Sequence, residues 1–99
     1  MPIFLKTERI KKKFLVNTQL TKEIIKKHVI WVKQLKQEGI NIKSGFLIDQ
    51  FKKPGGGGVL ILECKTYKDA EKIIKNDPMI KNQIVTWKLF EWNDVLTEK

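Results

Sequence analysis

The sequence contains one cysteine, Cys64, one histidine, His28, and one arginine, Arg9. A single cysteine excludes an internal disulfide, and one histidine with one cysteine at no recognised spacing makes no metal site unless two chains pool them. The longest apolar runs, 29–32 and 59–62, have four residues, whereas a membrane helix needs about 20. Residues 1–10 also lack the apolar core of a signal peptide. We therefore expect a reduced, cytoplasmic protein of one domain, with no metal, no cofactor and no membrane segment.

Acidic residues are also scarce, since 11 of them face 20 basic residues and give a net charge of +9. Such a charge suggests nucleic-acid binding, because lysines and arginines that neutralise phosphates dominate that affinity. However, base-edge and planar phosphate recognition favour the arginine fork, and only Arg9 provides one. The lysines are scattered, and 11–13 is their only run of three. We therefore favour a solvated lysine surface, with lysines on outer helix faces or at strand ends, over a nucleic-acid interface.

The hydrophobic pattern predicts four strands and two helices. Strands are expected at 3–10, 41–51, 59–64 and 84–92, and helices at 21–38 and from 67 to 75 or 76. Thr18 or Thr21 would cap the first helix, Gly39 would end it, and Thr66 to Asp69 form a capping box for the second. Residues 11–19, 52–58 and 79–83 are interpreted as connections, and 93–99 receive no assignment. The order βαββαβ predicts a ferredoxin-like α+β fold, with both helices on one face of an antiparallel sheet.

The second face of this sheet is expected to be apolar as well. Leu47 and Phe51 would lie on it, and the last strand carries bulky residues on both sides. In a monomer that face would contact water and should alternate towards polar residues. The sequence therefore predicts a homodimer that covers it.

His28 lies in the middle of the apolar stripe of the first predicted helix. At about 100° per residue, its neighbours on that stripe are apolar, namely Ile24, Trp31, Val32 and Leu35. A buried imidazole needs hydrogen-bond partners, because an unsatisfied buried polar group costs about 1–3 kcal/mol. One interpretation is a core histidine satisfied by a backbone carbonyl. The other is a general acid or base whose companion comes from elsewhere in the chain.

Asp77 is the candidate companion of His28. It lies where the second helix ends and the chain turns back towards the sheet, so its carboxylate could hold the imidazole in one tautomer. The alternative is that Asp77 and Pro78 only stop the helix and form a turn.

Five further residues are candidates for substrate binding: Trp31, Ser44, Gly45, Asp49 and Pro78. Ser44 and Gly45 interrupt a strand of bulky residues, which indicates either a cavity wall or a simple bulge. Asp49 is either a pocket residue or a solvated strand end, and tryptophans such as Trp31 are more often core residues. The glycine run 55–58 leads into a strand rather than into a helix with GK[ST], so a flexible hairpin loop is favoured over a phosphate cradle. Cys64 is interpreted as a packed strand residue rather than a nucleophile.

The chain resembles the YciI-like (YCII-related) proteins over nearly its whole length. The resemblance is carried by six segments: HVIWV (28–32), KSGFLID (43–49), GGGVLILE (56–63), YKDAE (67–71), NDPM (76–79) and EW (91–92). It implies a dimeric α+β barrel, related in fold to muconolactone-isomerase-like enzymes, with a cleft that contains His28 and Asp77. Most of the family has no assigned reaction, and a few relatives are lyases or dehalogenases acting on ring-cleavage lactones. This sequence departs from the family by its lysine-rich surface and by Met79, where an aromatic residue is common.

Two functions are therefore weighed. The first is a small enzyme of isomerase or lyase type, in which His28 moves a proton at a carbon next to a carbonyl and Asp77 orients it. The second is a dimeric binding module whose cleft holds a small molecule without turnover. The fold alone does not choose between them.

Overall fold

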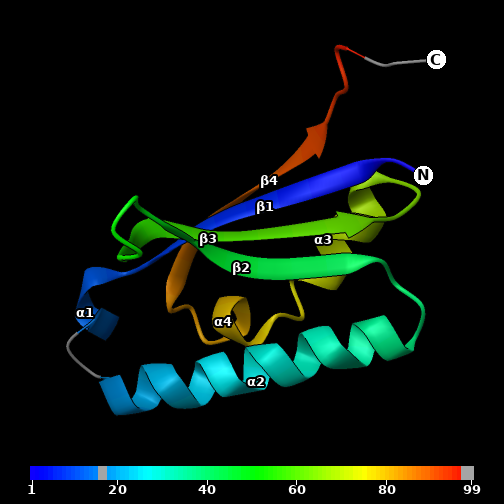
Figure 1. Cartoon of the computed structure of the whole chain (residues 1–99). Coiled ribbons are helices and arrows are strands. Elements are labelled where there is room, and N and C mark those ends of the chain that lie inside the picture. The colour runs from blue at the N-terminus through cyan, green and yellow to red at the C-terminus, as the bar shows by residue number, and fades with distance from the viewer. Residues whose placement is uncertain (16–17, 97–99) are drawn as a thin grey trace.

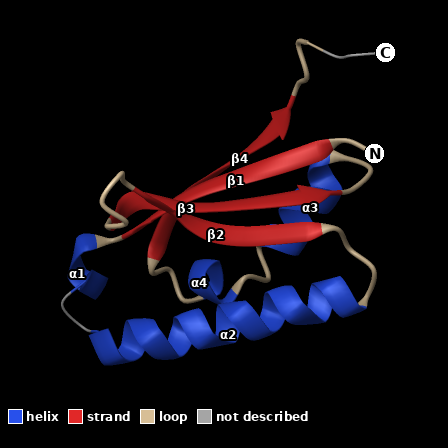
Figure 2. Cartoon of the chain, viewed as in Figure 1, coloured by secondary structure: helices blue, strands red, loops and turns tan. Residues whose placement is uncertain are grey.

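A four-stranded antiparallel sheet forms one layer of the molecule, and helices cover one of its faces (Figures 1 and 2). The computed structural model describes residues 1–15 and 18–96. Its elements in chain order are β1 (Ile3–Ile10), α1 (Lys12–Leu15), α2 (Thr18–Gln37), β2 (Ile42–Ile48), β3 (Pro54–Glu63), α3 (Tyr67–Ile74), α4 (Pro78–Lys81) and β4 (Val85–Trp92). The strand order β2-β3-β1-β4 places the first strand inside the sheet, between β3 and β4. The predicted ferredoxin-like α+β fold is confirmed.

The core lies between the sheet and the helices. Alternate residues of the strands meet the buried faces of α2 and α3, and they include Phe4, Ile42, Leu60 and Leu62. β1 contributes Phe4 to this core, and the alternation of side chains sends Lys6 to the same side. Both residues are fully buried. β1 therefore presents a charged side chain to the interior of the protein.

The helix α2 begins and ends close to the predicted boundaries. It begins at Thr18, three residues before the expected start, and Gly39 follows its end with a φ of +90°. Glycine adopts this left-handed conformation without steric cost, which explains why the helix stops there. Thr21 lies inside the helix and its hydroxyl donates to the carbonyl of Phe14. The expected connection 11–19 contains the short helix α1, and residues 16–17 of it lie outside the described residues.

The glycine run is not a flexible loop, and the predicted connection over 52–58 is confirmed only at 52–53 and is wrong from Pro54 onwards. β3 begins at Pro54, so the glycines belong to the strand, and Gly58 pairs with both Glu8 and Phe46. The turn lies earlier, where the carboxylate of Asp49 accepts hydrogen bonds from the backbone of Phe51 and Lys53. Glycine is needed at Gly57 because β3 approaches β1 closely there, and a Cβ on Gly57 would lie 2.5 Å from the carbonyl oxygen of Glu8.

Two caps organise the segment between β3 and β4. Thr66 caps α3 by accepting the backbone N–H of Asp69, as the capping box predicts. Asp77 then caps α4 by accepting the N–H of Met79, and Pro78 occupies the first helical turn. The expected turn at 79–83 is thus partly helical, because a capping aspartate followed by proline favours a new helical turn.

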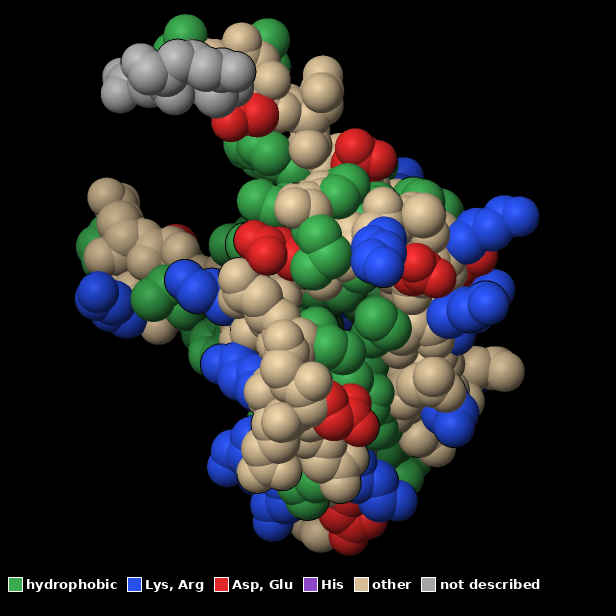
Figure 3. Space-filling model, turned by 90° about the vertical axis from the view of Figure 1, so that its right-hand side faces the viewer, with side chains coloured by type: hydrophobic (Ala, Val, Ile, Leu, Met, Phe, Trp, Pro, Cys, Tyr) green, Lys and Arg blue, Asp and Glu red, His purple; other side chains and the backbone are tan. Residues whose placement is uncertain are grey.

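The outer face of the sheet is apolar and uncovered in the single chain. Its exposed hydrophobic residues include Ile3, Leu47, Ile61, Phe90 and Trp92, which retain between 36% and 58% of their accessible surface. Figure 3 shows lysine and arginine side chains projecting from several sides of the molecule, with hydrophobic side chains between them. None of the described helices is both long and apolar enough to cross a membrane.

Candidate functional site

His28 lies on the buried face of α2, one helical turn after Ile24 and one before Val32. Its side chain faces the sheet and is almost entirely buried, with 7% of the residue exposed. The Trp31 ring packs beside it at a centroid distance of 5.7 Å. Both ring nitrogens have hydrogen-bond partners, and both partners are side chains rather than backbone carbonyls.

The partner of Nδ1 is Asp77, whose Oδ1 lies 2.8 Å away. Asp77 is fully buried at the turn between α3 and α4, and its own N–H donates to the carbonyl of Ile74. Oδ1 also accepts the N–H of Met79 at 2.9 Å, while Oδ2 accepts from Lys6 Nζ at 2.8 Å. Three donors therefore surround this carboxylate, two at Oδ1 and one at Oδ2. The residue that ends α3 and caps α4 also holds the histidine.

The pKa of Asp77 reflects two opposing effects. Burial alone would raise the pKa of this carboxyl, because a low-dielectric environment disfavours the charged form. The hydrogen bond to His28 and the charge and hydrogen bond of Lys6 outweigh burial, so the pKa is lowered from its ordinary value. Asp77 is therefore a carboxylate near neutral pH.

The partner of Nε2 is Ser44, whose Oγ lies 2.8 Å from it. Ser44 is on the edge strand β2, two residues after the buried Ile42, so both side chains lie on the helix-facing side. An ionised carboxylate only accepts hydrogen bonds, so Nδ1 of a neutral His28 carries the proton. Nε2 then accepts the hydroxyl proton of Ser44. The basic nitrogen of the ring thus points away from the buried carboxylate and towards the edge of the sheet.

A cavity of about 220 Å³ adjoins this edge of the ring. Its lining consists of one face of α2 and one residue of β2, namely His28, Val29, Val32, Lys33, Lys36 and Ser44. The chain therefore has an oriented imidazole, a hydroxyl and two ammonium groups around one hollow. This set can exchange a proton with a small bound molecule and attract a negative charge on it.

The other predicted binding residues lie around this centre or away from it. Trp31 packs against the imidazole, and Pro78 follows Asp77 in the capping turn, but neither lines the cavity. Gly45 follows Ser44 on β2, and the direction of its missing side chain meets no atom within 4 Å. Asp49 is exposed and holds the turn before β3, so the structure does not bring it to His28.

Cys64 is also separate from the site. It is buried beside the end of β3, where its thiol contacts the carbonyl of Thr66, and burial raises its pKa.

Two charged residues of the site were missed from the sequence, Lys6 and Glu8. The expectation that the lysines outside the run 11–13 sit on outer helix faces or at strand ends is wrong for Lys6, which is buried in the middle of the central strand. Its ammonium contacts the carboxylates of both Asp77 and Glu8. The signal was the alternation in β1, since Phe4, Lys6 and Glu8 share one side of a strand whose Phe4 is an obvious core residue.

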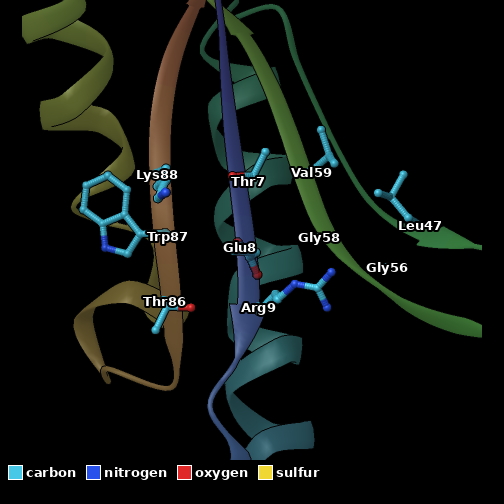
Figure 4. A pocket seen from close by; sticks show the side chains of 10 residues that line it. All are labelled: Thr7, Glu8, Arg9, Leu47, Gly56, Gly58, Val59, Thr86, Trp87 and Lys88. Carbon is cyan, nitrogen blue, oxygen red and sulfur yellow. The ribbon is translucent and has the colours of Figure 1, made fainter.

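A larger cavity of about 400 Å³ lies elsewhere on the sheet (Figure 4). Thr7, Glu8 and Arg9 of β1 lie in the middle of its wall, with β4 on one side and the glycine-rich part of β3 on the other. The Arg9 guanidinium donates to the carbonyl of Gly55. This cavity does not touch His28, so we place the candidate site at the smaller one. Within 1–15 and 18–96, no cluster of histidine, cysteine, aspartate and glutamate side chains is suited to a metal ion.

A solved structure of 5-chloro-2-hydroxyhydroquinone dehydrochlorinase from Burkholderia phenoliruptrix, in complex with 2,5-dihydroxybenzoquinone, is similar with a TM-score of 0.70. The two sequences are 20% identical, and the match covers 92% of this chain and 93% of the other. A comparison with curated proteins finds no match. The YCII-related domain, in contrast, matches residues 3–93, so the chain belongs to the YCII-related family.

Proposed function

We propose that this protein is a small-molecule enzyme of isomerase or lyase type, in which His28 is the general base and acid and Asp77 orients it. The observation that carries the proposal is the pair of bonds on one ring. Nδ1 is fixed by a buried, ionised carboxylate, and Nε2 points towards a cavity. An imidazole held in this way has one nitrogen free to accept a proton and a fixed direction.

The reaction would proceed through Nε2. A substrate in the cavity would present an acidic C–H next to a carbonyl group, displace the Ser44 hydroxyl from Nε2 and lose its proton there. The same nitrogen would then return the proton to another carbon of the substrate, or to a leaving group. Such a base contributes about 10²–10⁴ in rate. That factor suits an activated C–H and favours a substrate whose carbonyl already stabilises the anion.

The chemistry of the substrate can be narrowed by the lining of the cavity. Lys33 and Lys36 of α2 line the cavity together with His28, and their charges would attract an enolate, phenolate or carboxylate. The similar dehydrochlorinase structure holds 2,5-dihydroxybenzoquinone, a small ring with acidic hydroxyl groups. We therefore place small anionic carbonyl compounds, including hydroxyquinones and unsaturated lactones, first among the candidates.

We further propose that two copies pair through the open sheet face in the cytoplasm. The hydrophobic residues on that face come from all four strands, and those of β1, β3 and β4 are adjacent, since Ile3 pairs with Trp92 and Leu5 pairs with both Ile61 and Phe90. A contiguous apolar surface of this kind is uncommon on a monomer. A second copy brings an identical surface and would cover it by two-fold symmetry.

The test of the catalytic proposal is a panel of such carbonyl compounds, screened by thermal shift and then incubated in D₂O. A true substrate should stabilise the wild type and should gain deuterium at the carbon next to its carbonyl, as seen by proton NMR. Both effects should be lost in His28→Ala and Asp77→Ala. They should persist in Asp49→Ala, which removes a carboxylate outside the site.

Three results would count against the proposal. Deuterium exchange that survives in His28→Ala would remove the histidine from the mechanism. A ligand that binds the wild type, depends on His28 and is recovered without deuterium would instead indicate a binding module. If no compound stabilises the wild type more than it stabilises both site variants, the cavity is not the functional site for this class.

A further inference from the structure

The buried polar chain continues beyond Asp77, through Lys6 to Glu8. We propose that Lys6 and Glu8 are positioning residues that keep Asp77 as an acceptor and thereby hold His28 in the tautomer with a proton on Nδ1. This inference rests on the proposed role of His28. It adds two residues that touch neither the imidazole nor the cavity beside it.

Lys6 is an unusual residue for its position. It lies in the middle of the central strand with no exposed surface, and its neighbours across the sheet are Leu60 and Leu89. An apolar residue would fill this place without the cost of desolvating an ammonium group. Buried ion networks are often replaced by hydrophobic residues with no loss of stability. Stability alone therefore does not explain a lysine here, whereas its contact with Asp77 Oδ2 gives it a role at the site.

The charges around Lys6 indicate how it would act on Asp77 and, through Asp77, on His28. Lys6 lies between two carboxylates, those of Asp77 and Glu8, and carries the one positive charge in contact with both when His28 is neutral. Without it, Asp77 would lose the ammonium that lowers its pKa and would bind a proton more readily. A protonated carboxyl group can donate a hydrogen bond to Nδ1. The ring would then carry its proton on Nε2, and the nitrogen beside the cavity would no longer be a base.

The glycine run explains how Glu8 reaches Lys6. Gly58 pairs with Glu8 across the β1–β3 ladder. A Cβ on Gly58 would lie 2.9 Å from Glu8 Cγ and 3.1 Å from Cδ, so the absence of a side chain provides the space that the Glu8 side chain occupies. Gly58 does not need glycine for its backbone angle, since its φ is not in the left-handed region. Its importance is therefore the space that it leaves, and Gly58→Ala should push Glu8 away from Lys6.

The experiment uses the fact that His28 is the only histidine. In protein labelled with ¹⁵N-histidine and free of any histidine tag, both ring nitrogens can be observed directly. At neutral pH the wild type should show a protonated Nδ1 and an unprotonated Nε2. Lys6→Met should move the signals towards the opposite tautomer. Glu8→Gln and Gly58→Ala remove the second contact that fixes the Lys6 ammonium beside Asp77, so by letting it move away they should shift the signals in the same direction by less. Lys88→Met removes an exposed lysine on the neighbouring strand, so its signals should match the wild type.

Wild-type tautomer signals in a folded Lys6→Met protein, as judged by its amide spectrum, would overturn the proposal. Should Lys6→Met fail to fold, unchanged signals in both Glu8→Gln and Gly58→Ala would overturn it instead. No substrate is needed, so the positioning role can hold even where the catalytic proposal fails. With a substrate in hand, Lys6→Met should lower kcat more than it raises KM, by up to about 10⁴-fold, the loss that a wrong histidine tautomer causes in a serine protease.

Discussion

Ser44 Oγ lies 2.8 Å from Nε2 of His28, on the other side of the ring from the bond between Nδ1 and Asp77. Ser44 is an exposed residue, so we expect Ser44→Ala to lower the free energy of unfolding by about 1 kcal/mol or less, the net value of one hydrogen bond. Urea unfolding measures this loss. The proton on Nδ1 should stay in place, because the carboxylate that holds it is untouched. A reversed tautomer in Ser44→Ala would show that the serine, and not Asp77, sets the state of the ring.

The lowered pKa of Asp77 predicts that the folded protein loses stability in acid. Its pKa is lowered in the folded protein relative to about 3.9 for an unperturbed aspartate. The folded state therefore binds this proton less readily than the unfolded state does. The contribution of Asp77 is fully present above the unfolded pKa and is lost as the pH falls through the folded pKa. Urea unfolding between pH 7 and pH 3 should show a steeper decline for wild type than for Asp77→Asn.

The control for this measurement is Asp49→Asn, which removes an exposed carboxylate in the turn between β2 and β3. Its decline in acid should be close to that of the wild type. Equal slopes for wild type and Asp77→Asn would contradict the lowered pKa.

A charged substitution on the open sheet face should prevent the proposed dimer from forming. Phe90→Lys places a charge among the exposed apolar residues, where it would be costly to bury in a dimer interface but harmless in a monomer. Light scattering at micromolar concentration should give twice the chain mass of 11.6 kDa for wild type and the chain mass for the variant. Ile30→Lys, on an exposed position of α2, should remain dimeric. A monomeric wild type would contradict the pairing.

Substitution of Gly39 should lower stability only through the backbone conformation at the end of α2. Its φ is +90°, and a Cβ added there would meet no atom within 4 Å. Gly39→Ala should therefore cost only the strain of an L-residue in the left-handed region, about 1–2 kcal/mol. Gly39→Asn should cost less, because asparagine tolerates this region better. The midpoint of urea unfolding measures both, and an equal loss in the two variants would point to a cause other than backbone conformation.

Much of the fold could be predicted because its signals are local. The alternation in β1, the helical period around His28 and the capping pair of Thr66 and Asp69 each depend on residues a few positions apart. The sequence also pointed to the neighbourhood of His28 and Asp77. It could not give their distance, since the two residues are 49 positions apart and meet only when α2 and the α3–α4 turn pack together.

The features that the sequence does not predict arise where segments far apart in the sequence lie close together in the fold. The residues around Gly58 do not reveal that the Glu8 side chain lies beside it on the neighbouring strand. Taken alone, the glycine run therefore favours a loop. The sequence alone favours a surface position for Lys6, because lysine is almost never fully buried unless it is paired. Its two partners, Asp77 and Glu8, become visible only in three dimensions.

The central place of β1 in the sheet has a consequence for the order of assembly. β1 is made first, yet its neighbours are β3 and β4, and β4 is the last strand to leave the ribosome. Lys6 lacks the carboxylate of Asp77 until residue 77 emerges, and one edge of β1 has no partner until residues 85–92 emerge. Such long-range pairing is slow and leaves a strand edge open to other chains. A nascent chain that stalls before β4 should therefore depend on chaperones more than the finished protein does.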